Sequence, residues 1–465
     1  MTTSVSADLR EYIAANDRRF HEELFELLRI PSVSARAEHD GDTRRTAEWL
    51  REALESIGLD ASVHETPGHP IVLGEWRRAP EHSPTVLVYG HYDVQPPEPL
   101  ELWDSPPFEP TIRDGRIYAR GSADDKGQVI IHLKALEAHL KTRGSLPVNV
   151  IVLLEGEEET GSDHLAEFVE TNRERLRCDG VVISDSSMME PGLPTIISSL
   201  RGIAYLEIEV VGPAQDLHSG SFGGAVVNPA MALARILATF QDENGRIAIP
   251  GIYDAVREPS ASMRAALLGV PFDEAAFREE AGVSEVGGEA GYSTAERLWL
   301  RTSCDVNGMI SGYTGEGAKT VLPSRAMAKV SFRIVPDQTP DEIGRLVEEH
   351  VKRVAPRGVS VTVRHLHGGR PWRAEAEGPL FDAARRALEA AFGRAPVIIG
   401  EGASIPIVVD IERILGVPVL LTGFGLPGQN LHAPNEWLGD ENFRQGIVAV
   451  AAFWDEYGRR EQVGA

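Results

Sequence analysis

The sequence predicts an α/β fold in which a mostly parallel sheet is flanked by helices and is interrupted by an inserted α+β module. Short runs rich in Val, Ile and Leu alternate with helical segments up to about residue 199, as in sheets with helices on both faces. Longer alternating strands follow, and the alternation of short strands and helices resumes after Pro371. The expected boundaries are 1–199 and 373–465 for the two parts of one domain and 200–372 for the module.

The first part of the larger domain is expected to open with two helices between residues 6 and 57, separated at Ile30-Pro31-Ser32 and ended by Gly58. Strands and helices then alternate, with one hairpin turned by an Asp-Gly pair. In order, the expected elements are a strand at 85–89, a hairpin at 111–118, a helix at 126–143, a strand at 148–154, a helix near 163–175 and a strand at 181–184.

Periodicity also predicts the elements of the module and of the last part of the chain. The module is expected to hold strands at 204–211, 327–335 and 359–365, helices at 229–240 and 340–354, and an irregular helical stretch at 241–296. The last part is expected to hold helices at 379–392 and 440–457 and strands at 397–400 and 418–422.

Composition narrows the possible classes of function. At 465 residues and 50.6 kDa the chain exceeds the usual size of one hydrophobic core, so two domains, or three, are expected. The net charge of −24 argues against nucleic acid or an anionic membrane as a partner. The two cysteines, Cys178 and Cys304, form no C-x-x-C pair, so a metal would be held by oxygen and nitrogen. We see no signal-peptide pattern and no apolar run long enough to span a bilayer, so a cytoplasmic protein is expected.

A histidine and an acid follow the first strand of this alternation. Histidine is a common metal ligand, and a nearby carboxylate such as Asp93 can hold the second ring nitrogen of His91 and fix its orientation. The pair therefore indicates a metal site at a strand end. Taken alone, it is also compatible with a surface strand that ends in a chance His-x-Asp.

Further acids stand where buried strands end, and the carboxyl ends of strands are where open α/β sheets build ligand sites. Asp124 and Asp125 open a helix, although an ordinary N-cap needs only one acid. Residues 155–159 hold four acids in five positions, which repel unless cations or protons compensate them. For Glu155 and Glu157, the first two acids of this stretch, the alternative is a solvent-exposed run of charged residues that leads into a helix. Asp185 ends another apolar strand, and His432 stands in a turn between a strand and a helix.

In combination, these clusters belong to motifs that follow one another in the order of a known family. The motifs are GHYDVQP, WDSPPF, ARGSADDKG, LLEGEEETGS, ISDS, DLHSG, KTVLP, SFRIVP and LHAPNE. Over nearly its whole length the chain resembles the di-zinc metallopeptidases of family 20, related to aminoacylases and bacterial carboxypeptidases. The resemblance is closest to the cytosolic nonspecific dipeptidase and carnosinase branch, and it implies that the inserted module is a lid and dimerisation domain.

The resemblance implies two divalent metal ions per chain, zinc first, with manganese or cobalt also accepted by nitrogen and oxygen ligands. By position, His91 and Asp185 are similar to the ligands of one ion, and Glu159 and His432 to those of the other. Asp124 then resembles the carboxylate that bridges both. Two such ions with three carboxylates leave one net positive charge, which suits a hydroxide or a substrate oxygen.

The resemblance also implies the catalytic residues. Glu158 matches the general base, which would deprotonate a metal-bound water so that the hydroxide attacks the peptide carbonyl. Asp93 matches the acid that supports the metal-ligating His91. The family also has a cis peptide after its bridging aspartate, which corresponds here to the bond between Asp124 and Asp125.

The implied substrate contacts come partly from the lid. His218 matches a residue that reaches the active site of the partner subunit and stabilises the oxyanion, and Thr320 matches another group lent across a homodimer. Arg333 and Ser404 match same-subunit contacts to the substrate, to which His432 is added, and a guanidinium can bind a terminal carboxylate bidentately.

Other functions receive less support. The stretch 423–428 fits G-x-G-x-x-G, but Pro427 and Pro434 leave no helix N-terminus for a pyrophosphate, so the glycines are expected to let the chain turn tightly toward the metals. Motifs of single-zinc proteases and serine hydrolases are absent from the sequence. A binuclear metal hydrolase of dipeptides is therefore expected. Aminoacylase, carboxypeptidase or desuccinylase activity remains an alternative, as does a noncatalytic peptide-binding protein, which should have lost a ligand or the base.

Overall fold

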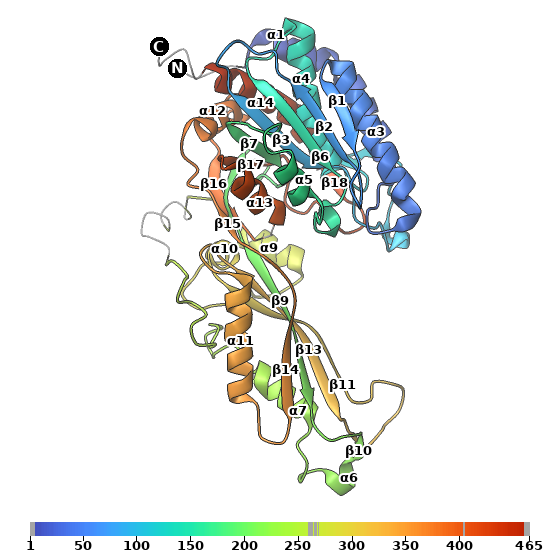
Figure 1. Ribbon diagram of the computed structural model, residues 1–465, viewed down its shortest axis with the longest axis vertical. Helices are drawn as coiled ribbons and strands as arrows, with labels where there is room; N and C mark the ends of the chain where they lie inside the picture. The colour runs from blue at the N-terminus through green and yellow to red at the C-terminus, as the bar shows by residue number, and fades with distance from the viewer. Residues whose placement is uncertain (1–4, 259–263, 265–266, 268, 403–404, 460–465) are drawn as a thin grey trace. The chain divides into compact units, whose positions relative to one another are not determined.

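The computed structural model describes residues 5–258, 264, 267, 269–402 and 405–459 (Figure 1). The chain divides into two compact units, each with a hydrophobic core of its own. Unit 1 comprises Met1–Ser198, Ala374–Ile399 and Asp410–Ala465, and unit 2 comprises Ser199–Arg373 and Gly400–Val409.

The largest sheet, whose strands other than β15 come wholly or mostly from unit 1, has the strand order β1-β2-β6-β3-β7-β17-β8-β15, and β16 also pairs with β8. The central strands β6, β3, β7 and β17 run parallel, whereas β1 and β2 at one edge and β8 and β15 at the other are antiparallel to their neighbours. The strands are β1 Asp60–His64, β2 Ile71–Trp76, β3 Thr85–His91, β6 Asn149–Glu155, β7 Gly180–Ser184, β8 Thr195–Leu200, β15 Trp372–Arg373, β16 Val397–Glu401 and β17 Val419–Thr422.

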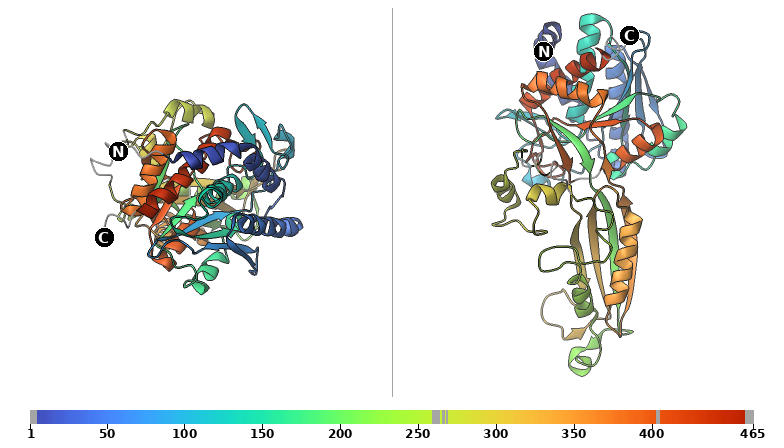
Figure 2. Two further views of the ribbon diagram at one scale, coloured as in Figure 1. Left: turned by 90° about the horizontal axis from the view of Figure 1, so that it is seen from above. Right: turned by 90° about the vertical axis from the view of Figure 1, so that its left-hand side faces the viewer.

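Helices cover both faces of this sheet (Figures 1 and 2). The central helix α4 is buried along its whole first part, from Lys126 to His139, and α14 packs against it. The helices are α1 Ala7–Ala15, α2 Asp17–Leu28, α3 Asp40–Ile57, α4 Lys126–Arg143, α5 Leu165–Thr171, α12 Pro379–Phe392, α13 Pro406–Leu415 and α14 Asp440–Gly458, with short 3₁₀ turns at Ala37–His39, Leu100–Leu102 and Glu158–Thr160.

The predicted α/β class with flanking helices is confirmed, but the prediction of two helices between residues 6 and 57 was wrong. The first of them is broken at Asn16, whose side-chain amide donates to the carbonyl of Tyr12 and so competes with the helical hydrogen bonds. The expected end of α3 is confirmed, because Gly58 has a φ of 108°, in the left-handed region that glycine adopts without strain.

A small sheet with the strand order β18-β5-β4 lies in the same unit and includes the predicted hairpin. Its strands are β4 Thr111–Arg113, β5 Arg116–Tyr118 and β18 Trp437–Gly439. Asp114 and Gly115 make the turn, both with positive φ, as a tight hairpin requires. Because β18 pairs with β5, the segment that leaves β5 lies beside the segment that enters β18.

Unit 2 is built on an antiparallel sheet with the order β11-β13-β9-β14, against which α7 and α11 pack. Figure 2 (right) shows α11, in orange, running along these strands. Fully buried and half-buried residues alternate along β9, as the sequence pattern predicted. The elements are β9 Gly202–Val211, β10 Leu217–His218, α6 Ser219–Phe222, α7 Pro229–Leu237, α9 Glu274–Ala281, α10 Thr294–Trp299, β11 Ser303–Ser311, β12 Val321–Leu322, β13 Arg325–Ile334, α11 Pro340–Val354 and β14 Ser360–Gly369. Among the described residues, no helix combines the length and apolar character needed to cross a membrane.

Candidate metal centre

Three neighbouring strands of unit 1 deliver acidic or histidine side chains to one edge of the sheet. Strand β3 ends at His91, which pairs in register with Glu155 at the end of the parallel strand β6. Strand β7 ends at Ser184, directly before Asp185. Because parallel strands share the direction of their carboxyl ends, these groups meet at the edge where α/β sheets hold ligands.

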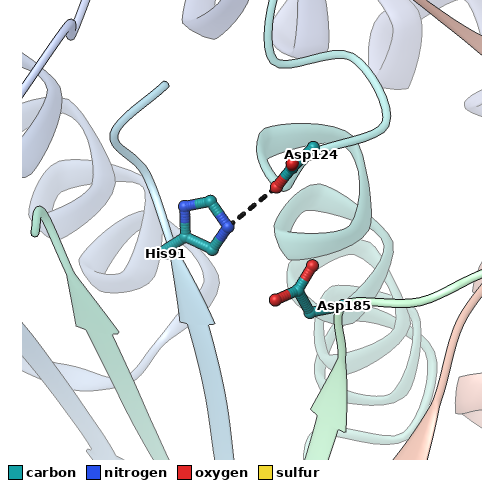
Figure 3. A group of neighbouring side chains, drawn as sticks. All are labelled: His91, Asp124 and Asp185. Carbon is teal, nitrogen blue, oxygen red and sulfur yellow. Dashed lines mark hydrogen bonds and ion pairs between the residues drawn. The ribbon is translucent and has the colours of Figure 1, made fainter. Parts of the chain in front are cut away.

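The first candidate ligand group contains His91, Asp124 and Asp185 (Figure 3). Their ligand atoms all lie within 4.8 Å of one another, and Nε2 of His91 is 3.0 Å from Oδ1 of Asp124. The histidine is fully buried at the end of its strand, and Asp124 precedes α4. These three side chains could therefore converge on one ion.

The second candidate group contains Asp124, Glu159 and His432. Nε2 of His432 lies 3.0 Å from Oδ2 of Asp124 and 3.4 Å from Oε2 of Glu159. Gln95 donates to the same Oε2 at 2.7 Å. Asp124 thus belongs to both groups, and each of its carboxylate oxygens faces a different histidine.

Asp93 lies on the far side of His91 from this cluster. Nδ1 of His91 is 3.1 Å from the backbone oxygen of Asp93 and 3.4 Å from its carboxylate, an arrangement that protonates Nδ1 and leaves Nε2 as a ligand atom. The Asp93 carboxylate also accepts the backbone N–H groups of Glu158 and Glu159 and the hydroxyl of Ser34. It therefore fixes a candidate ligand histidine and the turn that carries both glutamates.

The electrostatics of the cluster fit a divalent cation. Burial, with the nearby charge of Asp124, raises the pKa of Glu159 to about 9 and that of Asp185 to about 6. Burial alone would raise the pKa of Asp124 too, but hydrogen bonds to His432 and His91 hold that pKa below its usual range. Carboxyl groups packed so closely are ionised together only when positive charge compensates them. The imidazole nitrogens and carboxylate oxygens form a donor set suited to zinc, manganese or cobalt.

Glu158 lies beside this cluster but belongs to neither ligand group. Burial and the charge of Asp185 raise the pKa of Glu158 well above its usual range, and Asp124 and Glu159 add to this effect. The neighbouring Glu159, in contrast, belongs to the second candidate ligand group. The two adjacent glutamates therefore have different surroundings, as different roles require.

The lid residues predicted from the sequence lie in unit 2. His218 on β10 pairs with Val321 on β12, and the carbonyl of Thr320 accepts the N–H of Ser219 at 3.0 Å. Both His218 and Thr320 are exposed. Arg333 lies on β13 and is half-buried. The remaining predicted contact, Ser404, falls outside the residues that the structure describes.

The backbone near the centre has two features that bear on the candidate ligands. The peptide between Asp124 and Asp125 is cis, as the resemblance implied. The glycines at 423 and 425 lie against the segment that follows Asp185, and a Cβ on Gly423 would be 1.8 Å from the carbonyl oxygen of Ser186. These glycines thus allow two chain segments to approach closely beside a candidate ligand.

Three buried or nearly buried side chains near the predicted residues were not expected from the sequence. Arg120 and Glu436 form an ion pair of 2.6 Å beside Asp124. In unit 2, burial and the charge of Arg333 lower the pKa of Arg201 to about 10. Arg120 and Glu436 lie within the motifs ARGSADDKG and LHAPNE, but the sequence alone does not indicate that they pair, because each of the three acquires its surroundings from segments far away in the chain.

Comparison with known proteins places these observations in a family. The protein-family model described as Peptidase family M20/M25/M40 matches residues 87–456 of this chain. The Cys-Gly metallodipeptidase dug1 of Schizosaccharomyces pombe is 33% identical over 464 residues, covering 96% of this chain and 97% of the relative. The crystal structure of human carnosine dipeptidase 1 is 29% identical, with a TM-score of 0.85 and coverage of 99% of this chain and 100% of that chain. The metallo-carboxypeptidase Sso-CP2 of Sulfolobus solfataricus is 33% identical, with a TM-score of 0.82 and coverage of 94% and 99%.

Proposed function

Because the chain belongs to peptidase family M20/M25/M40, we propose that it hydrolyses the peptide bond of dipeptides at a centre of two divalent metal ions. Membership of this family and the prediction of a metallopeptidase, both made from the sequence motifs, are confirmed. The single observation that carries the binuclear proposal is the position of Asp124, whose two oxygens belong to two ligand groups at once.

In this proposal His91 and Asp185 would hold one ion and Glu159 and His432 the other, and Asp124 belongs to both groups. When bound, such a pair of ions polarises the scissile carbonyl and lowers the pKa of the attacking water. Zinc is the proposed metal, with manganese or cobalt as alternatives that suit the same donor atoms.

Glu158 acts as the general base. Its carboxylate accepts a proton from the attacking water as the new C–O bond forms, and it then gives that proton to the amine nitrogen as the C–N bond breaks. A glutamate next to the candidate ligands but outside both groups suits a proton carrier. Asp93 supports this step because it accepts the N–H of Glu158 and contacts His91.

His218 stabilises the oxyanion in the active site of a partner subunit, and Thr320 assists it there, so the proposed active unit is a homodimer. Nδ1 of His218 accepts the backbone N–H of Gly220 at 3.0 Å. In the neutral ring the proton then resides on Nε2, which makes that nitrogen a hydrogen-bond donor as an oxyanion requires. The exposure of both side chains supports a role toward another molecule. The proposal assigns 200–372 to this lid and 1–199 with 373–465 to the catalytic domain.

Arg333 binds the terminal carboxylate of the substrate, with Ser404 and His432 as further contacts. Two guanidinium groups, Arg201 and Arg333, are close enough for the charge of one to lower the pKa of the other. Such an arrangement favours an anion, and a guanidinium can hold a carboxylate through two parallel hydrogen bonds. A substrate with a free carboxylate near the scissile bond is therefore proposed.

The names of the relatives support dipeptides as the substrate class, since they act on Cys-Gly and on carnosine. A carboxypeptidase is the second candidate, because the structure of Sso-CP2 is equally close in sequence. Both activities require recognition of a terminal carboxylate of the substrate. They differ in how many substrate residues the site accepts on the amino side of the scissile bond. A noncatalytic peptide-binding protein is disfavoured, since all the ligand positions and the position of the base are occupied by suitable side chains.

Hydrolysis of a substrate panel by protein reconstituted separately with zinc, manganese or cobalt tests the proposal. The panel should contain Cys-Gly, β-Ala-His, other dipeptides, tripeptides, longer peptides and N-acyl amino acids. Rapid cleavage of dipeptides with little cleavage of longer peptides is expected. Preferential release of C-terminal residues from long peptides would establish the carboxypeptidase instead, and preference for N-acyl amino acids would favour an aminoacylase or a desuccinylase.

A further inference from the structure

The segment that carries Asp124 and the segment that carries His432 meet at the end of one strand pair. In the ladder between β5 and β18, Tyr118 pairs with Trp437. One residue beyond this pair, the N–H of Ala119 donates to the backbone oxygen of Glu436 at 3.2 Å. The turn after β5 therefore passes directly beside the residue that precedes β18.

The side chain of Glu436 points into that turn and is fully buried. Its Oε1 accepts the backbone N–H groups of Ala123 at 2.9 Å and Asp124 at 3.1 Å. Its Oε2 accepts the N–H of Gly121 at 2.9 Å and the Arg120 guanidinium at 2.6 Å. The two oxygens thus receive four donors, about the number that an ionised carboxylate can accept.

Arg120 extends this network to two other segments of the centre. Its second terminal nitrogen lies 3.2 Å from the carbonyl of Ala433, the residue after His432, and 3.5 Å from the carbonyl of Pro96. Pro96 follows Gln95, whose amide binds Glu159. One buried ion pair therefore contacts the segments that carry Asp124 and His432, and also the segment whose Gln95 binds Glu159.

We propose that Glu436 is a positioning residue of the metal centre, which holds the backbone of Asp124 in register with His432. A purely structural partner for Arg120 would need only the guanidinium contact. Three of the four donors to Glu436 are instead backbone N–H groups of the turn that ends at Asp124. The inference rests on the proposed function, in which the carboxylate of Asp124 must face both ions at once.

The test replaces Glu436 by Gln, which keeps the size of the side chain but leaves one acceptor oxygen for four donors. Glu456→Gln is the matched control, because Glu456 is also buried and binds Arg386 at 2.7 Å and Arg459 at 2.6 Å. Cobalt(II) is the probe, and its affinity, stoichiometry and visible absorption spectrum are measured together with the thermal unfolding of each metal-free protein. Loss of a group that orients a ligand weakens metal affinity by about 10–100-fold.

The expected result is that Glu436→Gln binds cobalt about 10–100-fold more weakly than the wild type and with an altered spectrum, while Glu456→Gln binds it normally. Wild-type affinity and spectrum in Glu436→Gln would overturn the inference. Should that variant fail to fold, Glu436→Asp replaces it, since a side chain one methylene shorter cannot reach the N–H groups of Gly121, Ala123 and Asp124 together, and unchanged cobalt binding would again overturn the inference. Failure of the wild type itself to bind two cobalt ions would refute the proposed function, a result distinct from equal binding by wild type and variant.

Discussion

His432 and Asp124 are 308 residues apart in the sequence, yet Nε2 of one lies 3.0 Å from Oδ2 of the other. The other oxygen of Asp124 faces His91 at the same distance. This shared carboxylate makes the candidate centre depend on two separate stretches of unit 1, because His91 and Asp124 precede unit 2 in the chain and His432 follows it. Metal binding, catalysis and the correct folding of both chain segments should therefore be linked.

The protein is expected to bind two metal ions per chain and to lose both activity and stability when they are removed. A ligand that binds only the folded state stabilises it by about 2.7 kcal/mol at a hundred times its dissociation constant, and the acids of the cluster repel one another without it. Elemental analysis of active protein and thermal unfolding before and after chelation measure both effects. Full activity with one ion per chain, or after complete chelation, would contradict the binuclear proposal.

Replacing the adjacent Glu158 and Glu159 one at a time should show which of them is the general base and which is a metal ligand. Glu158→Gln is expected to lower kcat by about 10²–10⁴-fold, the usual contribution of a general base, with both metals retained. Glu159→Gln should lower metal content as well as activity, because Glu159 alone of the two belongs to a ligand group. Metal content and turnover measured on the same samples decide between these outcomes. Normal metal occupancy in Glu159→Gln would reverse the assignment within the pair.

Stability should decrease in acid partly through His132, which is buried on α4 with Nε2 at 2.8 Å from the hydroxyl of Ser184. Burial lowers the pKa of His132 from 6.5 to about 3. Between these values the unfolded chain binds a proton that the folded protein does not, so stability present above pH 6.5 is lost as the pH falls toward 3. One such group changes the free energy of unfolding by at most about 1.4 kcal/mol per pH unit.

Denaturant unfolding of metal-free protein at several values between about pH 7.5 and about pH 5, a range that spans the ordinary histidine pKa, measures this slope. His132→Gln should be less stable at neutral pH but should show a shallower loss in acid. The control is His82→Gln, because 80% of the His82 side chain is exposed. An unchanged slope in His132→Gln would show that His132 is not responsible for this loss.

The parts of this protein that follow local rules were predictable from its sequence. The bounds of α4, α11 and α12 agree with the predicted helices, and the parallel strands that lead to His91 and Asp185 were recognised as apolar runs. These elements follow from periodicity and from turn residues such as Gly58. The motifs then made the family recognisable without any spatial information.

Other features depend on contacts that no local pattern encodes. The loop before β18 has positive φ at Asn430, His432 and Asn435, although none is glycine, so its path follows from its surroundings. The pair of Arg120 and Glu436 joins residues 316 apart through the ladder of two short strands. Such features become visible only once the strand pairing is known.

Substrate selection should depend on the shape as well as the charge of Arg333. Arg333→Lys is expected to raise KM for dipeptides nearly as much as Arg333→Ala, because an ammonium cannot reproduce the paired hydrogen bonds of a guanidinium to a carboxylate. Steady-state kinetics with free and C-terminally amidated dipeptides measure the effect, and the wild type should cleave the amidated forms poorly. Efficient cleavage of amidated dipeptides would argue against carboxylate recognition by this arginine.

The last prediction concerns a site shared between subunits. Glu158→Ala and His218→Ala should each be nearly inactive, since one removes the proposed base and the other the proposed donor to the oxyanion. A heterodimer with one chain of each kind contains one complete site, in which Glu158 of the second chain works with His218 of the first. Two-fold symmetry then predicts up to about half of the wild-type activity for such heterodimers, purified through two different tags.

Mixtures of the two homodimers that have not exchanged subunits serve as the control and should remain inactive. A heterodimer of His218→Ala with a second His218→Ala chain carrying the other tag should also be inactive, which excludes an effect of the tags. Recovery of activity only in the mixed species would require that His218 acts across the dimer. Inactive heterodimers of verified composition would mean instead that His218 serves its own chain or takes no part in catalysis.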